Sequence, residues 1–329
     1  MTTIASPAPK ISRRQAVTQA GLLVGAAVAG VSQTAFGLEP KPAPSRPSGR
    51  FVLCLNTATI RGQKLGIVKE IEVTAKAGYQ AIEPWVGDIE TYQKQGGSLP
   101  DLKRRIADSG LTVESAIGFP QWIVEDDAKR AQGLERAKFE MDLVAQIGGK
   151  RIAAPPSGAT DLPRLDLLKA TDRYRALLEA GDQIGVVPQL ELWGFSKNLN
   201  RLGECADVAI ETGHPKACLV ADIYHLYKGG SDFAGLRLLS RNAMQVFHLN
   251  DYPAATPREK IDDSYRLFPG DGVAPVTDIL RTLHENGGST VLSLELFNRK
   301  YWEMDALEVA RAGLEKVKAA VATALTKAA

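Results

Sequence analysis

The chain is poor in cysteine and carries no surplus of either charge. Only three cysteines occur in 329 residues, and an odd number without close spacing argues against a disulfide framework. Cys54 and Cys218 lie in apolar runs, where we expect buried small hydrophobic residues. Lys and Arg number 40 against 38 Asp and Glu, so the excess positive charge of a nucleic-acid-binding protein is missing.

No apolar run reaches the ~20 residues that a membrane-spanning helix needs. The longest one ends near Val31 and follows the paired basic residues Arg13 and Arg14. A basic segment, a short apolar segment and small residues before position 37 are the parts of an export signal. Paired arginines favour the twin-arginine (Tat) route. We therefore predict that residues 1–37 are a Tat signal peptide, with an uncleaved membrane anchor as the alternative.

Cleavage of this signal would leave a mature chain with no basic surplus. The first 37 residues contain Lys10, Arg13 and Arg14 and no acidic residue, so their removal leaves one basic residue fewer than the 38 acidic ones. Residues 38–49 are rich in Pro and Ser and predict an extended linker, and residues 50–329 form the predicted domain. We expect the Tat machinery as partner, a periplasmic or extracellular location, no nucleic-acid ligand and no stable membrane insertion after cleavage.

Short apolar runs alternate with longer amphipathic stretches from position 50 onward. Strands are predicted at 51–55, 80–84, 112–117, 150–154, 186–192, 217–222, 244–250 and 290–296. Helices are predicted at 65–77, 102–109, 127–147, 162–184, 199–212, 232–240, 276–286 and 304–325. Eight such units in one α/β domain predict a single-domain (β/α)8 TIM barrel. An open doubly wound sheet is the alternative, but no glycine-rich phosphate turn follows the first strand.

Each of the last four predicted strands carries one metal-capable side chain near its carboxyl end. In chain order these are Glu191, Asp222, His248 and Glu295. The carboxyl ends of the strands build the active site of such a barrel, so we expect the four side chains to converge there. Charges in apolar strands are costly unless they are paired or bind a cation. One divalent ion, Mn²⁺, Mg²⁺, Co²⁺ or Zn²⁺, suits this donor set, and four separate salt bridges are the alternative.

This quartet resembles the metal set of the xylose-isomerase-like TIM-barrel superfamily. The relevant branch holds sugar phosphate isomerase/epimerase-like proteins, including ketose 3-epimerases, hydroxypyruvate isomerase and inosose dehydratase. Two further motifs fit: Asp-x-x-His, present as Asp222 to His225, and Arg-x-x-Pro-Gly-x-Gly, present as Arg266 to Gly272. The resemblance covers about residues 50–320. It implies that Glu191, Asp222, His248 and Glu295 bind the metal.

The resemblance also implies a reaction. In the epimerases the two glutamates are both ligands and proton carriers, so Glu191 and Glu295 are the expected catalytic residues. They would move a proton next to a carbonyl through a metal-stabilised enediolate. His225 and Arg266 are the expected substrate-binding residues. The alternatives are that His225 only supports Asp222 and that Arg266 only pairs with Asp262, Asp263 or Asp271.

Some features depart from the 3-epimerases. The segment after the fifth strand lacks a further glutamate, and a long insert separates His248 from Arg266. Trp85, Trp122 and Trp193 follow strand ends, where Trp122 and Trp193 are expected to bind substrate by stacking on a sugar face. The alternative is that these rings pack under loops. Glu83 is expected to add an acidic group, and Asp251 to orient His248.

Three functions remain open from the sequence. The first is an isomerase or epimerase acting on a small sugar or keto-sugar, and the second is a lyase or hydratase acting on 3-keto-sugars or 3-keto-glycosides. The third is a non-catalytic sugar-binding barrel. The superfamily also contains a DNA-cutting enzyme with three zinc ions, but this chain has four histidines, of which His214 and His284 are predicted far from the mouth. The oligomeric state stays open, with a homo-oligomer among the options.

Overall fold

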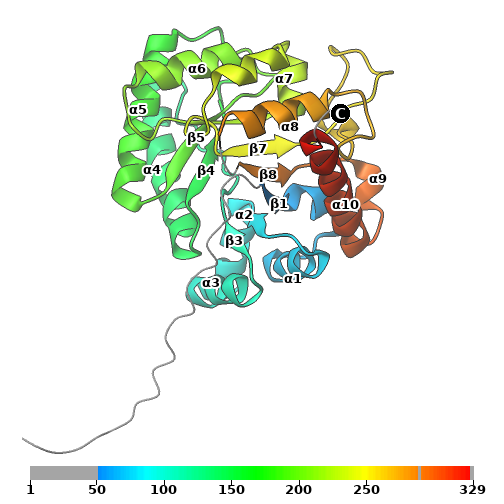
Figure 1. Cartoon of the computed structure of the whole chain (residues 1–329). Coiled ribbons are helices and arrows are strands. Elements are labelled where there is room, and N and C mark those ends of the chain that lie inside the picture. Colours follow the sequence, from blue (N-terminus) through cyan, green and yellow to red (C-terminus); the bar gives the residue numbers. More distant parts are fainter. Residues whose placement is uncertain (1–50, 288–289, 327–329) are drawn as a thin grey trace, which may run out of the picture. The chain divides into compact units, whose positions relative to one another are not determined.

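The computed structural model describes residues 51–287 and 290–326. The predicted signal peptide and linker therefore lie outside the described residues. Eight parallel strands form one sheet (Figure 1). They are β1 Val52–Asn56, β2 Ala81–Glu83, β3 Thr112–Val113, β4 Arg151–Ala154, β5 Val187–Glu191, β6 Leu219–Asp222, β7 Val246–Leu249 and β8 Val291–Leu294.

The sheet runs in the order β3-β2-β1-β8-β7-β6-β5-β4. Its two outer strands are joined beyond the end of β3. The amide of Ala116 donates to the carbonyl of Arg151 at 3.1 Å, and Ala153 donates to the carbonyl of Ala116 at 2.9 Å. These bonds connect the two outer edges of the sheet to each other. The α/β fold predicted from the alternating pattern, a (β/α)8 barrel, is confirmed.

Helices connect successive strands and lie around the outside of the sheet (Figure 1). The α-helices are α1 Ile67–Ala77, α2 Val86–Lys94, α3 Leu99–Asp108, α4 Asp127–Gln146, α5 Leu167–Ile184, α6 Leu202–Glu211, α7 Ile223–Gly229, α8 Val276–Glu285, α9 Arg299–Trp302 and α10 Ala306–Leu325. Three 3₁₀ helices, η1 Thr57–Gln63, η2 Phe233–Leu238 and η3 Asp263–Tyr265, complete the described part. Among these residues no helix combines the length and apolar character of a membrane span.

Several predicted boundaries are wrong for local reasons. The helix predicted at 162–184 begins only at Leu167, because Asp166 caps it by accepting the amide of Leu168. The helix predicted at 232–240 is the short η2. The sequence pattern also missed α2 and α7. Each starts within three residues of a strand's end, so no polar loop marked the change from strand to helix.

Alternation along the strands explains where polar groups collect. On β7, Val246 and His248 share one face, and on β8 Val291 shares a face with Ser293 and the following Glu295. Successive side chains of a strand point to opposite faces. An apolar inner layer therefore lies toward the amino ends, and a polar layer lies toward the carboxyl ends. The inner apolar cluster is Val52, Cys54, Ala81, Ile117, Ala153, Val220, Val246 and Val291.

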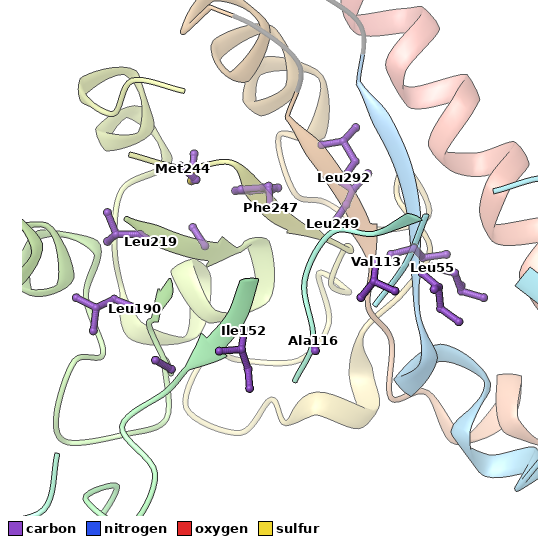
Figure 2. Packing of buried hydrophobic residues seen from close by; sticks show 14 of the residues in the cluster. Leu55, Val113, Ala116, Ile152, Leu190, Leu219, Met244, Phe247, Leu249 and Leu292 are labelled. Atoms are coloured by element: carbon purple, nitrogen blue, oxygen red, sulfur yellow. The ribbon is translucent and has the colours of Figure 1, made fainter. Parts of the chain in front are cut away.

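The other face of each strand packs against the helices. Leu190 on β5, Phe247 on β7 and Leu292 on β8 are fully buried in this outer layer (Figure 2). All three cysteines, Cys54, Cys205 and Cys218, are free and buried. This outcome confirms the prediction of small hydrophobic residues for Cys54 and Cys218.

One buried carboxylate lies away from the polar layer. Glu70 on α1 is 3% exposed, and its Oε2 has no hydrogen-bond partner among the residues described. Burial and the nearby Asp88 raise the pKa of Glu70 to about 8, although Arg61 opposes the shift. The folded protein therefore keeps a neutral carboxyl group where the unfolded chain has an ionised one.

We predict that Glu70→Gln stabilises the protein at alkaline pH. Between the ordinary carboxyl pKa and about 8 the folded state binds a proton that the unfolded state has lost, so wild-type stability falls as pH rises through this window. The neutral amide removes this loss. The melting temperature of the variant, measured by circular dichroism, should match wild type near pH 5 and exceed it by roughly 5–10 °C near pH 8.5.

The exposed Glu72 on the same helix supplies the control. Glu72→Gln should change the melting temperature by the same small amount at every pH. A Glu70→Gln effect that is equally independent of pH would show that the carboxyl group is not neutral in the folded protein.

Candidate metal and substrate site

The four predicted ligands end four adjacent strands and are all buried. Glu191 ends β5, Asp222 ends β6, His248 lies in β7 and Glu295 follows β8. Asp222 and His248 are fully inaccessible, while Glu191 and Glu295 are each 4% exposed and line a cavity. The cross-strand register places Asp222 beside His248. Strand alternation thus directs all four side chains to one end of the barrel.

The Nδ1 atom of His248 faces three carboxylates. It lies 3.2 Å from Oε2 of Glu295, 3.8 Å from Oε1 of Glu191 and 3.9 Å from Oδ2 of Asp222. Nδ1 is buried and has no hydrogen-bond partner among the residues described, so the 3.2 Å contact lacks hydrogen-bond geometry. Buried polar atoms normally have a partner. A lone imidazole nitrogen facing carboxylate oxygens fits a bound divalent cation.

Ligand atoms of Asp222, His248 and Glu295 all lie within 4.8 Å of one another. Glu191 does not belong to this group of three, although its Oε1 lies 3.8 Å from Nδ1 of His248. The carboxylate of Glu191 accepts no hydrogen bond from any residue described. It is therefore the least restrained member of the quartet.

The opposite nitrogen of His248 is held by Glu83, at the end of β2. Nε2 lies 3.1 Å from Oε2 of Glu83. The Glu83 carboxylate also accepts hydrogen bonds from Ser293 at 2.6 Å and from Nδ2 of Asn56 at 3.0 Å. A carboxylate on Nε2 fixes the tautomer that leaves the Nδ1 lone pair free, as in many metal sites. The Glu83 carboxyl group thus orients His248, a role that the sequence had suggested for Asp251.

The cluster shifts the proton affinities of its members. Burial raises the pKa of Glu191, His248 opposes this, and the charges of Glu295 and Asp222 bring it to about 8. Burial lowers the pKa of His248, but Glu295 and Glu83 outweigh it and raise the pKa above its ordinary value. Protonation of Glu191 and of His248 therefore offsets part of the negative charge of the cluster, and a bound divalent ion would replace the Nδ1 proton of His248.

Asp222 has two separate tasks. Its Oδ1 accepts the amide of His225 at 2.9 Å and so caps the amino end of α7. Its Oδ2 accepts hydrogen bonds from Arg266 at 2.6 Å and from Asn250 at 3.1 Å. The Asp-x-x-His spacing is thus that of a helix cap, which fixes His225 on the first turn. Burial raises the pKa of Asp222, but Arg266 and His225 lower it to about 2, so the carboxyl group is ionised.

Arg266 reaches into the cluster from the loop after β7. Its Nη1 donates to Asp222 at 2.6 Å and to Glu295 at 2.8 Å, and its Nη2 donates to Asp263 at 2.6 Å. Burial lowers the pKa of this 1% exposed guanidinium, but the three carboxylates raise it above its ordinary value. Arg266 therefore pairs with Asp263, one of the partners named in the alternative, but it also bonds two expected metal ligands and lines the cavity.

His225 lies between two N–H groups. Gly194 donates its amide to Nδ1 at 3.3 Å, and Nη2 of Arg266 lies 3.1 Å from Nε2. Burial and Arg266 lower the pKa of His225 although Asp222 opposes them, so the ring is neutral. A neutral imidazole carries one hydrogen, so only one of these contacts is a hydrogen bond at a time. His225 can therefore exchange partners when a ligand oxygen arrives.

The loop that delivers Arg266 is fixed by Asp251. The carboxylate of Asp251 accepts the amides of Gly270 and Gly272 at 2.9 and 3.0 Å and that of Ala274 at 2.8 Å. A Cβ at Gly272 would lie 2.2 Å from the carbonyl oxygen of Tyr252, so only glycine fits. The Pro-Gly-x-Gly motif is thus a turn built around one carboxylate, and Asp251 does not contact His248.

The long insert before Arg266 is fastened to α7. Lys228 on α7 donates to the carbonyls of Arg258, Glu259 and Ile261 at 3.0, 3.0 and 2.8 Å. The rings of Tyr227 and Tyr252 stack with centroids 3.9 Å apart. This segment leads into η3, which carries Asp263 to the cavity wall. The insert therefore shapes the site, although it supplies no expected metal ligand.

The cavity above the quartet has a volume of about 180 Å³. Its polar wall contains Glu191, His225, Asp263, Arg266 and Glu295, and its apolar wall contains Trp85, Ile117, Phe119, Trp193, Phe195 and Phe297. Trp193, which was expected to bind substrate, is therefore at the cavity.

The structure does not bring Trp122 to this cavity. Its ring is 2% exposed, packs against Tyr174 and donates its Nε1 hydrogen to the carbonyl of Pro155 at 2.8 Å. Trp122 is a core residue, which corrects the expectation that it contacts substrate.

Sequence reasoning missed two asparagines of the site. Asn56 ends β1 and donates to both Glu83 and Glu295, at 3.0 and 3.1 Å. Asn250, just after β7, donates to Asp222. Each lies an even number of residues after an inward-facing residue of its strand, so its side chain also points inward. This two-residue spacing was the signal in the sequence that could have revealed them.

Comparison with known proteins agrees with the barrel fold described above. Residues 71–320 match the family described as Xylose isomerase-like TIM barrel. An inosose isomerase of Bacillus licheniformis is 24% identical over 278 residues, covering 80% of this chain and 95% of that protein. A 3-dehydroshikimate dehydratase of Pseudomonas aeruginosa is 25% identical over 231 residues, which is 70% of this chain but 36% of that protein.

Among solved structures, the IOLI protein with a zinc atom bound superposes with a TM-score of 0.77 at 22% identity. The match covers 84% of this chain and all of that one. The family match spans most of the barrel, including His248 and the three carboxylates around its Nδ1 atom. The chain therefore belongs to the xylose isomerase-like TIM-barrel family.

Proposed function

We propose that this protein is a divalent-metal-dependent isomerase or epimerase that moves a proton next to the carbonyl of a small sugar or keto-sugar. The observation that carries the proposal is the unpartnered Nδ1 of His248, which faces three carboxylates in a buried cluster. The similarity to inosose isomerase supports it. Relatives of this kind are enzymes, which also favours catalysis over simple sugar binding.

In this proposal Glu191, Asp222, His248 and Glu295 hold the ion. A bound divalent ion would polarise the substrate carbonyl and a neighbouring hydroxyl oxygen. The identity of the metal, Mn²⁺, Mg²⁺, Co²⁺ or Zn²⁺, is left open, although a zinc atom is bound in the structurally similar IOLI protein.

The two glutamates differ in a way that suits proton transfer. Glu295 accepts hydrogen bonds from Arg266 at 2.8 Å and from Asn56 at 3.1 Å, so its carboxylate is fixed. Glu191 accepts none among the residues described. Glu191 is therefore the carboxylate best able to take a proton, and Glu295 is the second carboxylate, held in a fixed position by its hydrogen bonds. His225 and Arg266 offer N–H groups to developing negative charge on substrate oxygens.

A dehydratase or lyase acting on 3-keto-sugars or 3-keto-glycosides is the second candidate. It shares the first step, removal of a proton next to a carbonyl, and then expels an oxygen group from the adjacent carbon. The similarity to 3-dehydroshikimate dehydratase favours it. The carboxyl group that has taken the proton would return it to the departing oxygen, and His225, a neutral imidazole in the cavity wall, would offer that oxygen an N–H hydrogen bond.

We predict that the purified full-length protein binds about one divalent ion per chain. Substitution of His248 by Ala, or of both Glu191 and Glu295 by Gln, should abolish binding because it removes donors from the cluster. Inductively coupled plasma mass spectrometry after dialysis measures the metal content. Each variant should keep the wild-type circular dichroism spectrum.

Two further variants sharpen this experiment. His284→Ala removes an exposed histidine on α8 and should leave metal content unchanged. Glu83→Gln should still bind metal but with roughly 10–100-fold lower affinity, because it weakens the partner of His248. If wild type takes up no ion when Mn²⁺, Mg²⁺, Co²⁺ and Zn²⁺ are each supplied, the metal proposal is wrong.

We predict solvent-deuterium exchange at a carbon next to a carbonyl. The metal-loaded protein would be incubated in D₂O with a ketohexose, an inosose, 3-dehydroshikimate and a 3-keto-glucoside, and NMR would follow the C–H signals. Glu191→Gln should slow exchange by about 10²–10⁴-fold because it removes the proton acceptor. Glu303→Gln, an exposed glutamate after α9, is the control and should exchange normally.

The products separate the two candidate reactions. An isomer or epimer keeps the mass of the substrate, whereas a dehydratase product is lighter by one water. Absence of exchange with every probe in the metal-loaded protein would favour the non-catalytic sugar-binding barrel.

We also propose that residues 1–37 direct export through the Tat pathway to the periplasm or beyond. The support is the Arg13-Arg14 pair before a short apolar run. A bacterial host should deliver a shortened protein to its periplasmic fraction, as seen by mass spectrometry. Arg13→Lys, Arg14→Lys should retain the full-length form in the cytoplasm, as should a host without the Tat translocase. Export that persists in both would contradict the Tat assignment.

A further inference from the structure

We propose that the apolar wall of the cavity is a subsite for a planar aromatic aglycone, so that the substrate is an aryl keto-glycoside whose sugar ring lies over the metal-facing floor. The inference rests on the proposed function, because it takes that floor as the sugar site. The aromatic rim is defined here as Trp85, Phe119, Trp193, Phe195 and Phe297.

The rim is continuous. Ring centroids are 6.0 Å apart between Phe297 and Trp85, and 5.0 Å apart between Trp85 and Phe119. They are 5.9 Å apart between Phe119 and Trp193 and 5.2 Å apart between the stacked rings of Trp193 and Phe195. The five rings follow the ends of β2, β3, β5 and β8. They therefore form an arc around the mouth and are not scattered packing residues.

Two members of the rim are open to solvent. Phe119 is 39% exposed and Phe195 is 43% exposed, while Trp85 and Trp193 are partly exposed. Covering such apolar surface is favourable by about 25 cal/mol per Å². Contiguous exposed aromatic side chains beside a cavity are typical of ligand sites.

The size of the cavity indicates what the rim does not bind. A volume of about 180 Å³ is below the roughly 300–1,000 Å³ of pockets for drug-sized ligands, so it encloses one sugar-sized group. A pyranose ring has two faces, so at most two aromatic rings can stack on it. The rim supplies five rings, and its exposed members have surface left for a second group attached to the sugar.

The chemistry of the rim favours an aromatic group over a second sugar. Phe119, Phe195 and Phe297 have no hydrogen-bonding atom. The Nε1 hydrogen of Trp85 is already donated to Oδ1 of Asn56 at 3.1 Å. Sugar hydroxyls would thus lose water and gain few partners, whereas a planar apolar ring gains offset or edge contacts.

The test compares phenyl and methyl β-D-glucoside by isothermal titration calorimetry on the full-length metal-loaded protein. Neither probe has a ring carbonyl, so the titration reports binding without turnover. We expect the phenyl glucoside to bind about tenfold more tightly, as one or two aromatic pairs would give. Phe119→Ala and Phe195→Ala should each reduce this phenyl-to-methyl preference severalfold.

Phe139→Ala is the matched control. Phe139 on α4 is 44% exposed, lies beside Arg136 and does not line the cavity. Its loss should leave the preference for the phenyl glucoside unchanged. Equal affinity for the two glucosides, no measurable binding of the phenyl glucoside, or an equal effect of all three variants would overturn the rim proposal.

The experiments distinguish a wrong proposal for the aromatic rim from a wrong proposal for the reaction. Deuterium exchange without a phenyl preference would refute the aglycone subsite and leave the proposed reaction standing. A phenyl preference in a protein that exchanges no substrate proton would refute the reaction and keep the rim as a binding surface.

Discussion

Four buried carboxylates, Glu83, Glu191, Asp222 and Glu295, share the polar end of one barrel, and their mutual repulsion governs the rest of the site. A buried anion is stable only if a cation or several N–H groups neutralise it. Here His248 and Arg266 supply the positive charge, while Asn56, Asn250 and the backbone amide of His225 donate hydrogen bonds. Arg266 forms ion pairs with Asp222 and Glu295, and His248 pairs with Glu83 through Nε2. This pairing leaves Glu191 and the Nδ1 face of His248 without a fixed partner, which is the place in the cluster that suits a divalent ion.

The need to neutralise the buried carboxylates also explains the structure of the loops that hold Arg266 in place. Arg266 can neutralise the carboxylates only if its guanidinium stays beside them. Asp263 and the turn around Asp251 hold it in that position. The turn demands glycine at position 272 because the carbonyl of Tyr252 leaves no room for a Cβ. The insert is in turn fixed by Lys228, whose ammonium group is bound by three carbonyls. The insert thus has a fixed position from which it carries Asp263 to the cavity wall.

The sequence predicted the barrel and brought attention to the right strand ends because both depend on local periodicity. The apolar strands are interrupted by Glu191, Asp222, His248 and Glu295. Burying such side chains costs free energy, so their presence in these strands already indicates a functional site in the sequence. Sequence analysis did not assign Asn56 and Asn250 to the site, because a neutral amide at a strand end does not indicate a functional role until its hydrogen-bond partners are known. Trp122 was misassigned because a tryptophan after a strand can face either the mouth or the core. Its contact with Pro155, far away in the sequence, decides between them. The short helix α7 was missed because its cap, Asp222, is also the last residue of a strand.

The cavity divides chemically into two parts, and this division bears on the fate of the substrate once a proton has been removed. Glu191, Glu295, Arg266 and His225 form a polar floor that suits removal of a proton next to a carbonyl, a step common to isomerases, epimerases and dehydratases. The second step depends on whether the substrate carries a leaving group on the adjacent carbon and on where that group rests. An aromatic rim beside the neutral imidazole of His225, with Phe195 5.6 Å from that ring, would hold an apolar leaving group near a hydrogen-bond donor. If the rim binds an aglycone, the geometry favours elimination over epimerisation, because the carboxyl group that took the proton would return it to the departing oxygen of the aglycone beside the rim.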